Sequence, residues 1–206
     1  MNHSADTNTH ENTAKKYEAI IFDLDGTLYD TSIVDPLLQQ LRQVKRMSPE
    51  YHQIWRDIDK TIDGYKDYDG MSEVLNFIRE NDIKTVLVTG AVKRRTNKLK
   101  RFNLPLMGIV SRFDVSHKKP HPAPMFRALE ILGCDASKVL SIGNQIIDLQ
   151  SSKGAGIDFA LASWGVRDHE REQLQQESDY VLSDPREIIG MIHSRLGGDQ
   201  SSTSVG

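Results

Sequence analysis

Short apolar runs alternate along the chain with longer amphipathic stretches, from about residue 17 to residue 196. Each short run has the length and apolar composition of a strand that is buried on both faces. Strands are predicted at Ala19–Phe22, Thr85–Val88, Val139–Ile142, Phe159–Ala162 and Tyr180–Leu182. Helices are predicted at Met71–Asn81, Lys93–Phe102, Pro122–Leu132, Ile147–Ala155, Arg167–Gln176 and Pro185–Leu196. This alternation is typical of a doubly wound α/β fold, in which helices cover both faces of a parallel sheet.

One segment, from Thr31 to Tyr68, interrupts this alternation. Its pattern predicts two helices, Val34–Arg46 and Pro49–Ile62, with no strand between them. An insertion after the first strand would lie over the carboxyl edge of the sheet, where it could act as a lid. The predicted division is therefore a tail at 1–16, a Rossmann-like core at 17–30 and 69–196, a small α-helical cap at 31–68 and a second tail at 197–206.

Composition narrows the class of protein. A chain of 206 residues with 38% hydrophobic content can form one core with a small appended lid. The formal charge of -3 does not suggest a nucleic-acid surface, and no apolar stretch approaches the length of a membrane span. The single cysteine, Cys134, cannot form an internal disulfide, which is compatible with a reducing compartment. We expect a cytoplasmic protein, monomeric or homodimeric, with no nucleic-acid or membrane partner.

Two carboxylates, Asp23 and Asp25, follow directly after the first predicted strand. Residues two apart in an extended segment point to the same side, so the two side chains can converge on one small space. Their mutual repulsion then requires a divalent cation, or a proton held on one of them. Taken alone, the pair is equally compatible with an ordinary turn.

Two further motifs suit the binding of an anion. Thr89 and Gly90 end the second predicted strand, where a hydroxyl and exposed backbone N–H groups can bind an anionic oxygen, although a helix N-cap fits as well. Lys119 lies in a proline-rich loop before a helix, which suits a cation fixed against phosphate or carboxylates as well as a surface lysine. His117 and His121 flank it, and without Cys or His partners at ligand spacing they are interpreted as loop residues.

The last motif begins where the strand Val139–Ile142 ends and runs from Gly143 through Asn144 to Asp148. Oxygen ligands at the ends of two strands would form a site for a hard cation such as Mg²⁺. Asp148 is equally suited to capping the helix that follows. Neither interpretation is excluded by this segment alone.

Together, these motifs resemble the four motifs of the haloacid dehalogenase superfamily, in the order that the family has them. They are Asp23–Thr27, Thr89, Lys119–Pro120 and Gly143–Asp148, and the likeness extends over about Tyr17 to Leu196. The resemblance implies a Rossmann-like fold with a helical cap, and is strongest to the branch of phosphoglycolate phosphatases. The substrate class that it implies is a small phosphorylated metabolite.

The resemblance also implies a role for each residue. Asp23 would attack phosphorus and form an aspartyl-phosphate, while Asp25 would protonate the leaving oxygen and later activate water. The phosphoryl oxygens would be bound by Thr89, Gly90 and Lys119.

The implied cofactor is Mg²⁺, held by Asp23, the backbone carbonyl of Asp25, and oxygens of Asn144 and Asp148. The family usually has an aspartate at the position of Asn144. The amide can still ligate Mg²⁺, but one negative charge is missing, so weaker metal binding is expected. The predicted cap is also shorter than is usual, which predicts a more open site.

The leading hypothesis is therefore a Mg²⁺-dependent phosphatase. The alternative is a weakly active or inactive relative that binds a phosphorylated ligand or a protein partner, and Asn144 is the observation that favours it. A phosphomutase or phosphotransferase fits less well, because a short lid would not exclude water.

Overall fold

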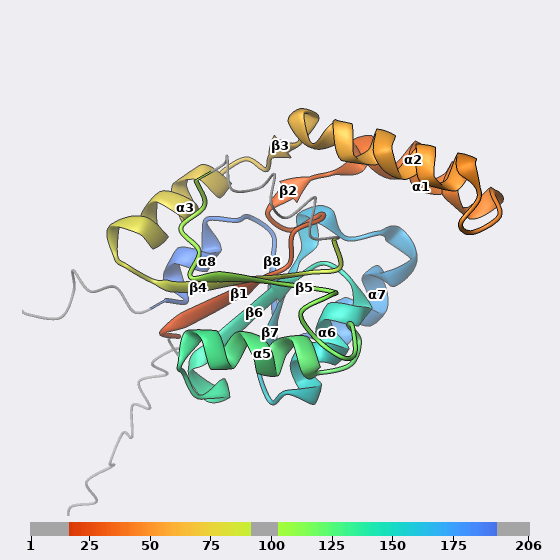
Figure 1. Cartoon of the computed structure of the whole chain (residues 1–206). Coiled ribbons are helices and arrows are strands. Elements are labelled where there is room, and N and C mark those ends of the chain that lie inside the picture. Colours follow the sequence, from red (N-terminus) through yellow and green to blue (C-terminus); the bar gives the residue numbers. More distant parts are fainter. Residues whose placement is uncertain (1–16, 92–102, 193–206) are drawn as a thin grey trace, which may run out of the picture.

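The computed structural model describes residues 17–91 and 103–192, which form a six-stranded parallel sheet with the order β5-β4-β1-β6-β7-β8 (Figure 1). Each neighbouring pair of strands is parallel, so the predicted fold class is confirmed. The strands are β1 Ala19–Phe22, β4 Lys84–Thr89, β5 Gly108–Ser111, β6 Val139–Gly143, β7 Asp158–Ala162 and β8 Tyr180–Leu182.

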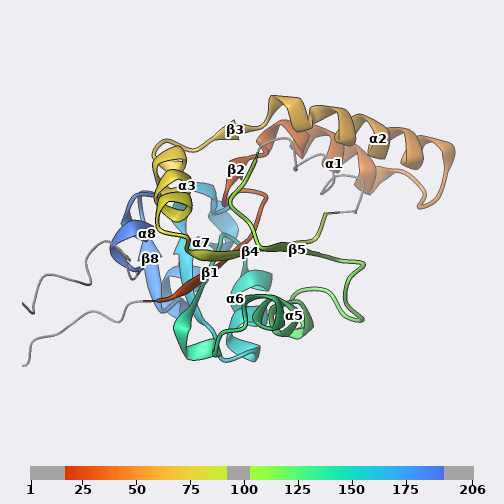
Figure 2. The ribbon, with the colours of Figure 1, turned by 60° about the vertical axis from the view of Figure 1, so that its left-hand side comes forward.

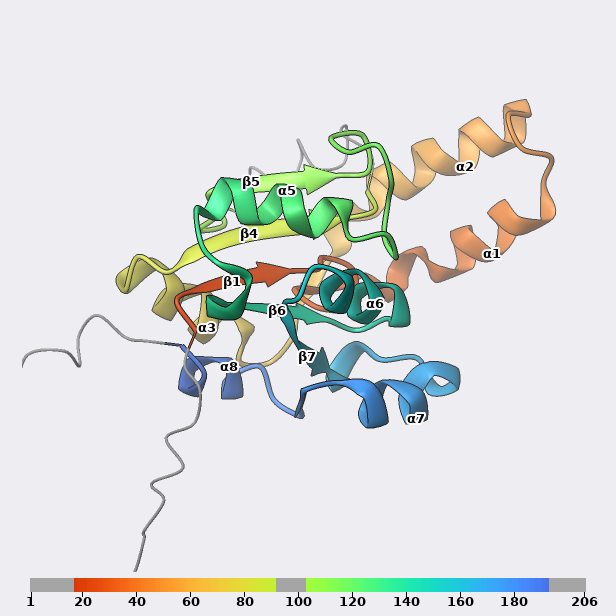
Figure 3. The same cartoon turned by 90° about the horizontal axis from the view of Figure 1, so that it is seen from below.

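Helices cover both faces of this sheet (Figures 1 and 3). One face carries α3 (Met71–Glu80) and α8 (Glu187–Gly190), and the other carries α5 (Ala123–Leu132), α6 (Ile146–Gly154) and α7 (Asp168–Glu177). Single turns of 3₁₀ helix occur at Ser32–Val34, Thr61–Gly64, Ala136–Lys138 and Ser163–Gly165.

The central strand β1 is apolar along its whole length because both of its faces are buried. Ile20 and Phe22 belong to the larger hydrophobic cluster, whereas Ala19 and Ile21 belong to the cluster under α5, because alternate residues face opposite sides. All four side chains are fully buried. A strand covered on both faces therefore reads as a continuous apolar run.

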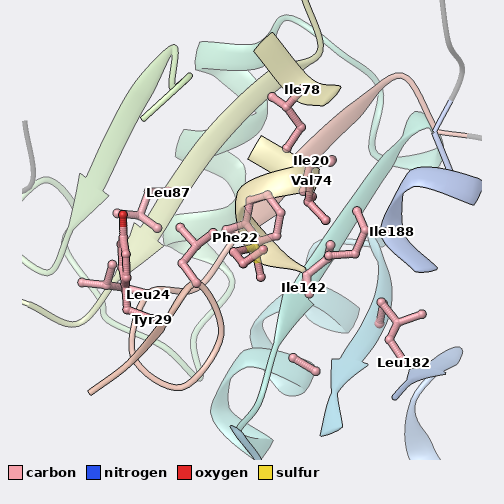
Figure 4. Packing of buried hydrophobic residues seen from close by; sticks show 14 of the residues in the cluster. Ile20, Phe22, Leu24, Tyr29, Val74, Ile78, Leu87, Ile142, Leu182 and Ile188 are labelled. Carbon is pink, nitrogen blue, oxygen red and sulfur yellow. The ribbon is translucent and has the colours of Figure 1, made fainter. Parts of the chain in front are cut away.

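The larger cluster joins α3 and α8 to the sheet. Figure 4 shows Ile20 and Phe22 of β1 near Val74 and Ile78 of α3, with Ile188 of α8 beside them. These residues hold the helices of this face in place and leave the carboxyl edge of the sheet to the loops.

The insertion after β1 consists of the helices α1 (Asp35–Gln43) and α2 (Pro49–Lys60). They lie side by side beyond the carboxyl end of β1 (Figures 1 and 2). The two chain segments that join them to the core, β2 (Tyr29–Asp30) and β3 (Lys66–Asp67), pair antiparallel. Ser48 caps α2 by accepting a hydrogen bond from the backbone N–H of Tyr51.

The sequence pattern located five of the six sheet strands and missed β5, which has only two strongly apolar residues and therefore no run to recognise. It also missed the two-residue strands β2 and β3. The last helix is shorter than predicted, because α8 ends at Gly190. The predicted helix Lys93–Phe102, the end of Pro185–Leu196 and both predicted tails lie outside the described residues. No helix within 17–91 or 103–192 is long and apolar enough to cross a membrane.

Candidate active site

Adjacent parallel strands bring the predicted motifs to one edge of the sheet. β1 lies between β4 and β6, so Asp23 and Asn144, which directly follow β1 and β6, lie beside Thr89, the last residue of β4. The backbone N–H of Asp23 donates to the carbonyl of Ile142 at 2.9 Å, which extends the pairing of β1 with β6 by one residue. The Asp23 carboxylate is thereby fixed to the rigid end of the sheet.

Beyond Asp23 the chain makes a tight turn. Gly26 has a φ of 83°, a conformation that favours glycine, and its N–H donates to the carbonyl of Tyr29 at 2.9 Å. A Cβ at Gly26 would lie 2.2 Å from Nδ2 of Asn144. The turn therefore requires glycine both for its backbone conformation and for its close approach to Asn144.

Lys119 lies at the centre of the site and is buried. Its Nζ is 2.7 Å from Oδ1 of Asp23, 2.6 Å from Oδ1 of Asp148 and 3.0 Å from the carbonyl oxygen of Val88. An ammonium group has three N–H donors, so these three acceptors use all of them. Burial by itself lowers the pKa of Lys119, but the charges of Asp148 and Asp23 outweigh this and raise it, so the lysine stays charged.

The second carboxylate oxygen of Asp23, Oδ2, is buried and has no hydrogen-bond partner in the described part of the chain. Burial raises the pKa of this carboxyl to about 7, although the charge of Lys119 lowers it and that of Asp148 adds to the increase. A buried oxygen without a partner is costly, and such atoms concentrate at functional sites. The Oδ2 atom is therefore a candidate to react with a substrate or to bind a cation.

Asp23 lines a cavity of about 270 Å³, which we call the nucleophile cavity. Its lining includes Asp23, Asp25, Thr89, Gly90 and Lys119. Five residues that the sequence singled out separately are thus brought together around one space. Oγ1 of Thr89 accepts a hydrogen bond from the N–H of Ala91 at 3.1 Å, so the threonine caps the turn and can still donate its own proton.

Asn144 and Asp148 do not line this cavity. Nδ2 of Asn144 donates to the carbonyl of Gly165 at 2.7 Å, and its Oδ1 accepts from the hydroxyl of Thr27 at 3.3 Å. Oδ2 of Asp148 accepts from the N–H of Gln145 at 3.1 Å and caps α6. Asp148 therefore serves both as a helix cap and as a partner of Lys119.

The side-chain oxygens of Asn144 and Asp148 already accept hydrogen bonds, whereas Oδ2 of Asp23 accepts none from the described residues. Each carbonyl-type oxygen has a second lone pair, so the set still fits a hard cation with oxygen ligands. However, residues 17–91 and 103–192 contain no group of three or more His, Cys, Asp or Glu side chains placed to hold a metal. The residues present therefore fit a site for a divalent cation in which few of the ligands are charged.

A second cavity of about 350 Å³ lies between the insertion and the core, and we call it the insertion cavity. Asp25 and Gln145 line both cavities, so the two meet at the carboxylate that follows Asp23. Trp55 of α2 and two arginines, Arg42 and Arg167, contribute to the lining of the insertion cavity. The insertion therefore borders the site from the side of Asp25.

The histidines flanking the lysine loop lie away from this chemistry. The rings of His117 and His121 stack with centroids 4.5 Å apart, and Nδ1 of His121 accepts from the N–H of Ala123. Neither lines the nucleophile cavity. The sequence did not single out Arg112, which lines that cavity directly after β5, because the strand that carries it was itself missed.

The fold and the site define a class of protein, a Rossmann-like α/β protein with a buried aspartate at the carboxyl edge of its sheet. The sequence profile of the haloacid dehalogenase-like hydrolases matches residues 32–162. The chain belongs to this family, in its phosphoglycolate-phosphatase-like branch.

Named relatives resemble the chain over most of its length. An N-acetylmuramic acid 6-phosphate phosphatase of Pseudomonas aeruginosa is 27% identical, with 88% of this chain and 97% of the relative covered. The pyrophosphatase PpaX of Bacillus velezensis is 28% identical, with coverage of 86% and 97%. A phosphoglycolate phosphatase of Xylella fastidiosa is 27% identical, with coverage of 81% and 89%.

Solved structures resemble the fold. CbbY from Rhodobacter sphaeroides, in complex with phosphate, has a TM-score of 0.68 at 20% identity and covers 84% of this chain and 96% of its own. A hydrolase of the same superfamily from Geobacter sulfurreducens has a TM-score of 0.67 at 19% identity, with coverage of 85% and 100%. At these identities the likeness shows a shared fold and nothing about activity.

Proposed function

We propose that the protein is a Mg²⁺-dependent phosphatase that hydrolyses a phosphate monoester of a small metabolite through an aspartyl-phosphate. One observation carries the proposal: Asp23 is held rigidly at the end of a central strand, with a buried Oδ2 that has no partner among the described residues, in a cavity that also contains Asp25. The three relatives described above are phosphatases by name, which supports the reaction class.

In the first step, Asp23 attacks phosphorus, a bond forms between its carboxylate oxygen and phosphorus, and the bond to the leaving oxygen breaks. Asp25 donates a proton to that oxygen, so the product leaves as an alcohol. In the second step, water attacks the aspartyl-phosphate and Asp25 accepts a proton from it. Inorganic phosphate leaves, and both aspartates return to their initial states.

The surrounding residues divide the tasks of binding. The hydroxyl of Thr89 and the N–H of Gly90 would bind phosphoryl oxygens, since both line the nucleophile cavity. The Lys119 ammonium would contribute positive charge beside Asp23 without a hydrogen bond to the phosphoryl group, because its three N–H donors are already in use. This role is narrower than direct phosphate binding.

Four residues would hold Mg²⁺, namely Asp23, the carbonyl of Asp25, Asn144 and Asp148. When bound, the ion would supply positive charge that offsets the negative charge of the nucleophile and of the phosphoryl group. With asparagine in place of a carboxylate at Asn144, the site binds the ion more weakly than a site with a further acid.

We also propose that residues 31–68 form a cap over the core at 17–30 and 69–196. The insertion cavity would then receive the leaving group, since it meets the nucleophile cavity at Asp25. A phosphate-binding protein with little turnover is the second candidate function, and the hydrogen bonds that occupy Asn144 favour it.

Hydrolysis of p-nitrophenyl phosphate tests the proposal. Turnover should require millimolar Mg²⁺, should be lost on addition of EDTA, and should fall by at least about a thousandfold in Asp23→Asn. Asp135→Asn makes the same chemical change at an exposed position and should retain activity. Turnover that persists in Asp23→Asn, or that is absent at every Mg²⁺ concentration, would refute a phosphatase that uses this nucleophile.

A further inference from the structure

The lining of the nucleophile cavity contains more positively charged side chains than are needed to neutralise Asp23 and Asp25. Three cations, Arg112, Lys118 and Lys119, line it. Lys119 is neutralised by the carboxylates of Asp23 and Asp148 and has no N–H left to donate. In the described lining, Arg112 and Lys118 therefore remain as the cations able to meet an incoming anion.

Neither of these two side chains is committed to a structural ion pair. Both are exposed, and neither forms a salt bridge with another described residue. The guanidinium carbon of Arg112 lies 4.8 Å from the ring centroid of Phe113, a cation–π contact that leaves its N–H groups available. Such contacts orient an arginine without neutralising its charge.

The backbone places both cations close to the predicted phosphate site. Ser111 pairs with Thr89 in the register of β5 with β4, so Arg112 is one residue beyond this pair, at the same level as Gly90. Lys118 directly precedes Lys119. Asp114 lies in the loop between Arg112 and Lys118. Its Oδ2 accepts hydrogen bonds from the backbone N–H and the hydroxyl of Ser111, at 2.8 and 2.5 Å, and so holds the start of this loop.

We propose that Arg112 and Lys118 form a second anion site, which binds a carboxylate or second phosphate group of the substrate beside the phosphoryl group that reacts. A guanidinium offers paired N–H groups that match either oxyanion, and the lysine adds a mobile point charge. This inference rests on the proposed phosphatase function and specifies its substrate class. The favoured substrates are small molecules with two anionic groups.

The insertion cavity is less suited to this role. Its arginines, Arg42 and Arg167, share the lining with Asp30 and Asp35, and Nη2 of Arg167 lies 3.9 Å from Oδ1 of Asp35. The positive charge there is offset by neighbouring carboxylates. An uncharged part of a leaving group fits this cavity better than a second anion.

Matched pairs of substrates test the second anion site. Phosphoglycolate is compared with 2-hydroxyethyl phosphate, which lacks the carboxylate, and pyrophosphate is compared with methyl phosphate. In Arg112→Gln and Lys118→Gln, the preference in kcat/KM for the substrate with two anionic groups should fall by about 10- to 100-fold, mainly through KM. The pair that shows the larger fall identifies the oxyanion as carboxylate or phosphate.

Arg127→Gln is the control, because Arg127 is an exposed arginine of α5 that pairs with Glu130 and lines neither cavity. It should retain the preference. An unchanged preference in both cavity variants would overturn the inference while leaving the phosphatase function intact. A loss of preference in Arg167→Gln instead would place the second anion in the insertion cavity and would also overturn it.

Binding separates the two proposals when turnover is absent. If the wild-type protein hydrolyses none of the four substrates, the phosphatase function fails. Calorimetric titration of Asp23→Asn with pyrophosphate and with inorganic phosphate still measures the second anion site. Tighter binding of pyrophosphate, reduced about tenfold or more by adding Arg112→Gln, would support the site, and equal affinities would refute it.

Discussion

Replacing Asn144 with aspartate should destabilise the metal-free protein and increase its affinity for Mg²⁺. The Asn144 side chain is 3% exposed and connects two loops, because Nδ2 donates to the carbonyl of Gly165 at 2.7 Å. An aspartate has no N–H to donate. Its carboxylate oxygen would face the carbonyl oxygen of Gly165, so that the hydrogen bond is replaced by a repulsive contact.

The cost follows from the lost bond. A hydrogen bond contributes about 1 kcal/mol net to stability, and a partly buried carbonyl left without a partner costs about 1 to 3 kcal/mol more. The free energy of unfolding should therefore fall by about 2 to 4 kcal/mol in EDTA. For a chain of this length, that corresponds to a decrease in Tm of about 4 to 16 °C.

Magnesium should reverse part of this loss, because the new carboxylate adds charge to the proposed metal site. Saturation at about 100 times the Kd would return about 2.7 kcal/mol to the folded state. Thermal unfolding in EDTA and across a Mg²⁺ titration measures both effects. Asn144→Ala, which loses the bond without adding charge, should be destabilised without this recovery.

Two outcomes would refute the reasoning. If Asn144→Asp were as stable as wild type in EDTA, the bond to Gly165 would contribute nothing to holding the loops together. If Mg²⁺ affinity were unchanged, Asn144 would not face the metal.

Further predictions concern the strand ends. The stability of Asp23→Asn relative to the wild type, both without metal, should increase from about pH 5 to about pH 8, because a carboxyl with a raised pKa destabilises the fold as it ionises. An equal difference in Tm at both pH values would contradict this. Gly165→Ala should lower the free energy of unfolding by more than about 3 kcal/mol, and Tm with it, since its Cβ would lie 1.7 Å from the carbonyl oxygen of Gly26. Gly190→Ala, with open space at its Cβ, is the control and should unfold at or above the wild-type temperature.

Much of the core was predictable because burial on both faces leaves a local signature. β1 and β8 have the predicted bounds, and β4, β6 and β7 differ by one or two residues. β5 was missed because its sequence, Gly108–Ser111, contains only two strongly apolar residues between a glycine and a serine. Arg112 was missed with it, and the proposed second anion site therefore depends on the structure.

The sequence by itself determined which residues follow the strand ends, and the common direction of parallel strands determined that they share one edge. Only the tertiary structure decided their partners. Lys119 binds Asp23 across 96 residues of chain, and Asn144 binds Gly165 across 21, choices that depend on the strand order and on loop packing. Hydrophobic periodicity indicates which side of a helix or strand is buried, but it does not indicate which distant residue packs against that side.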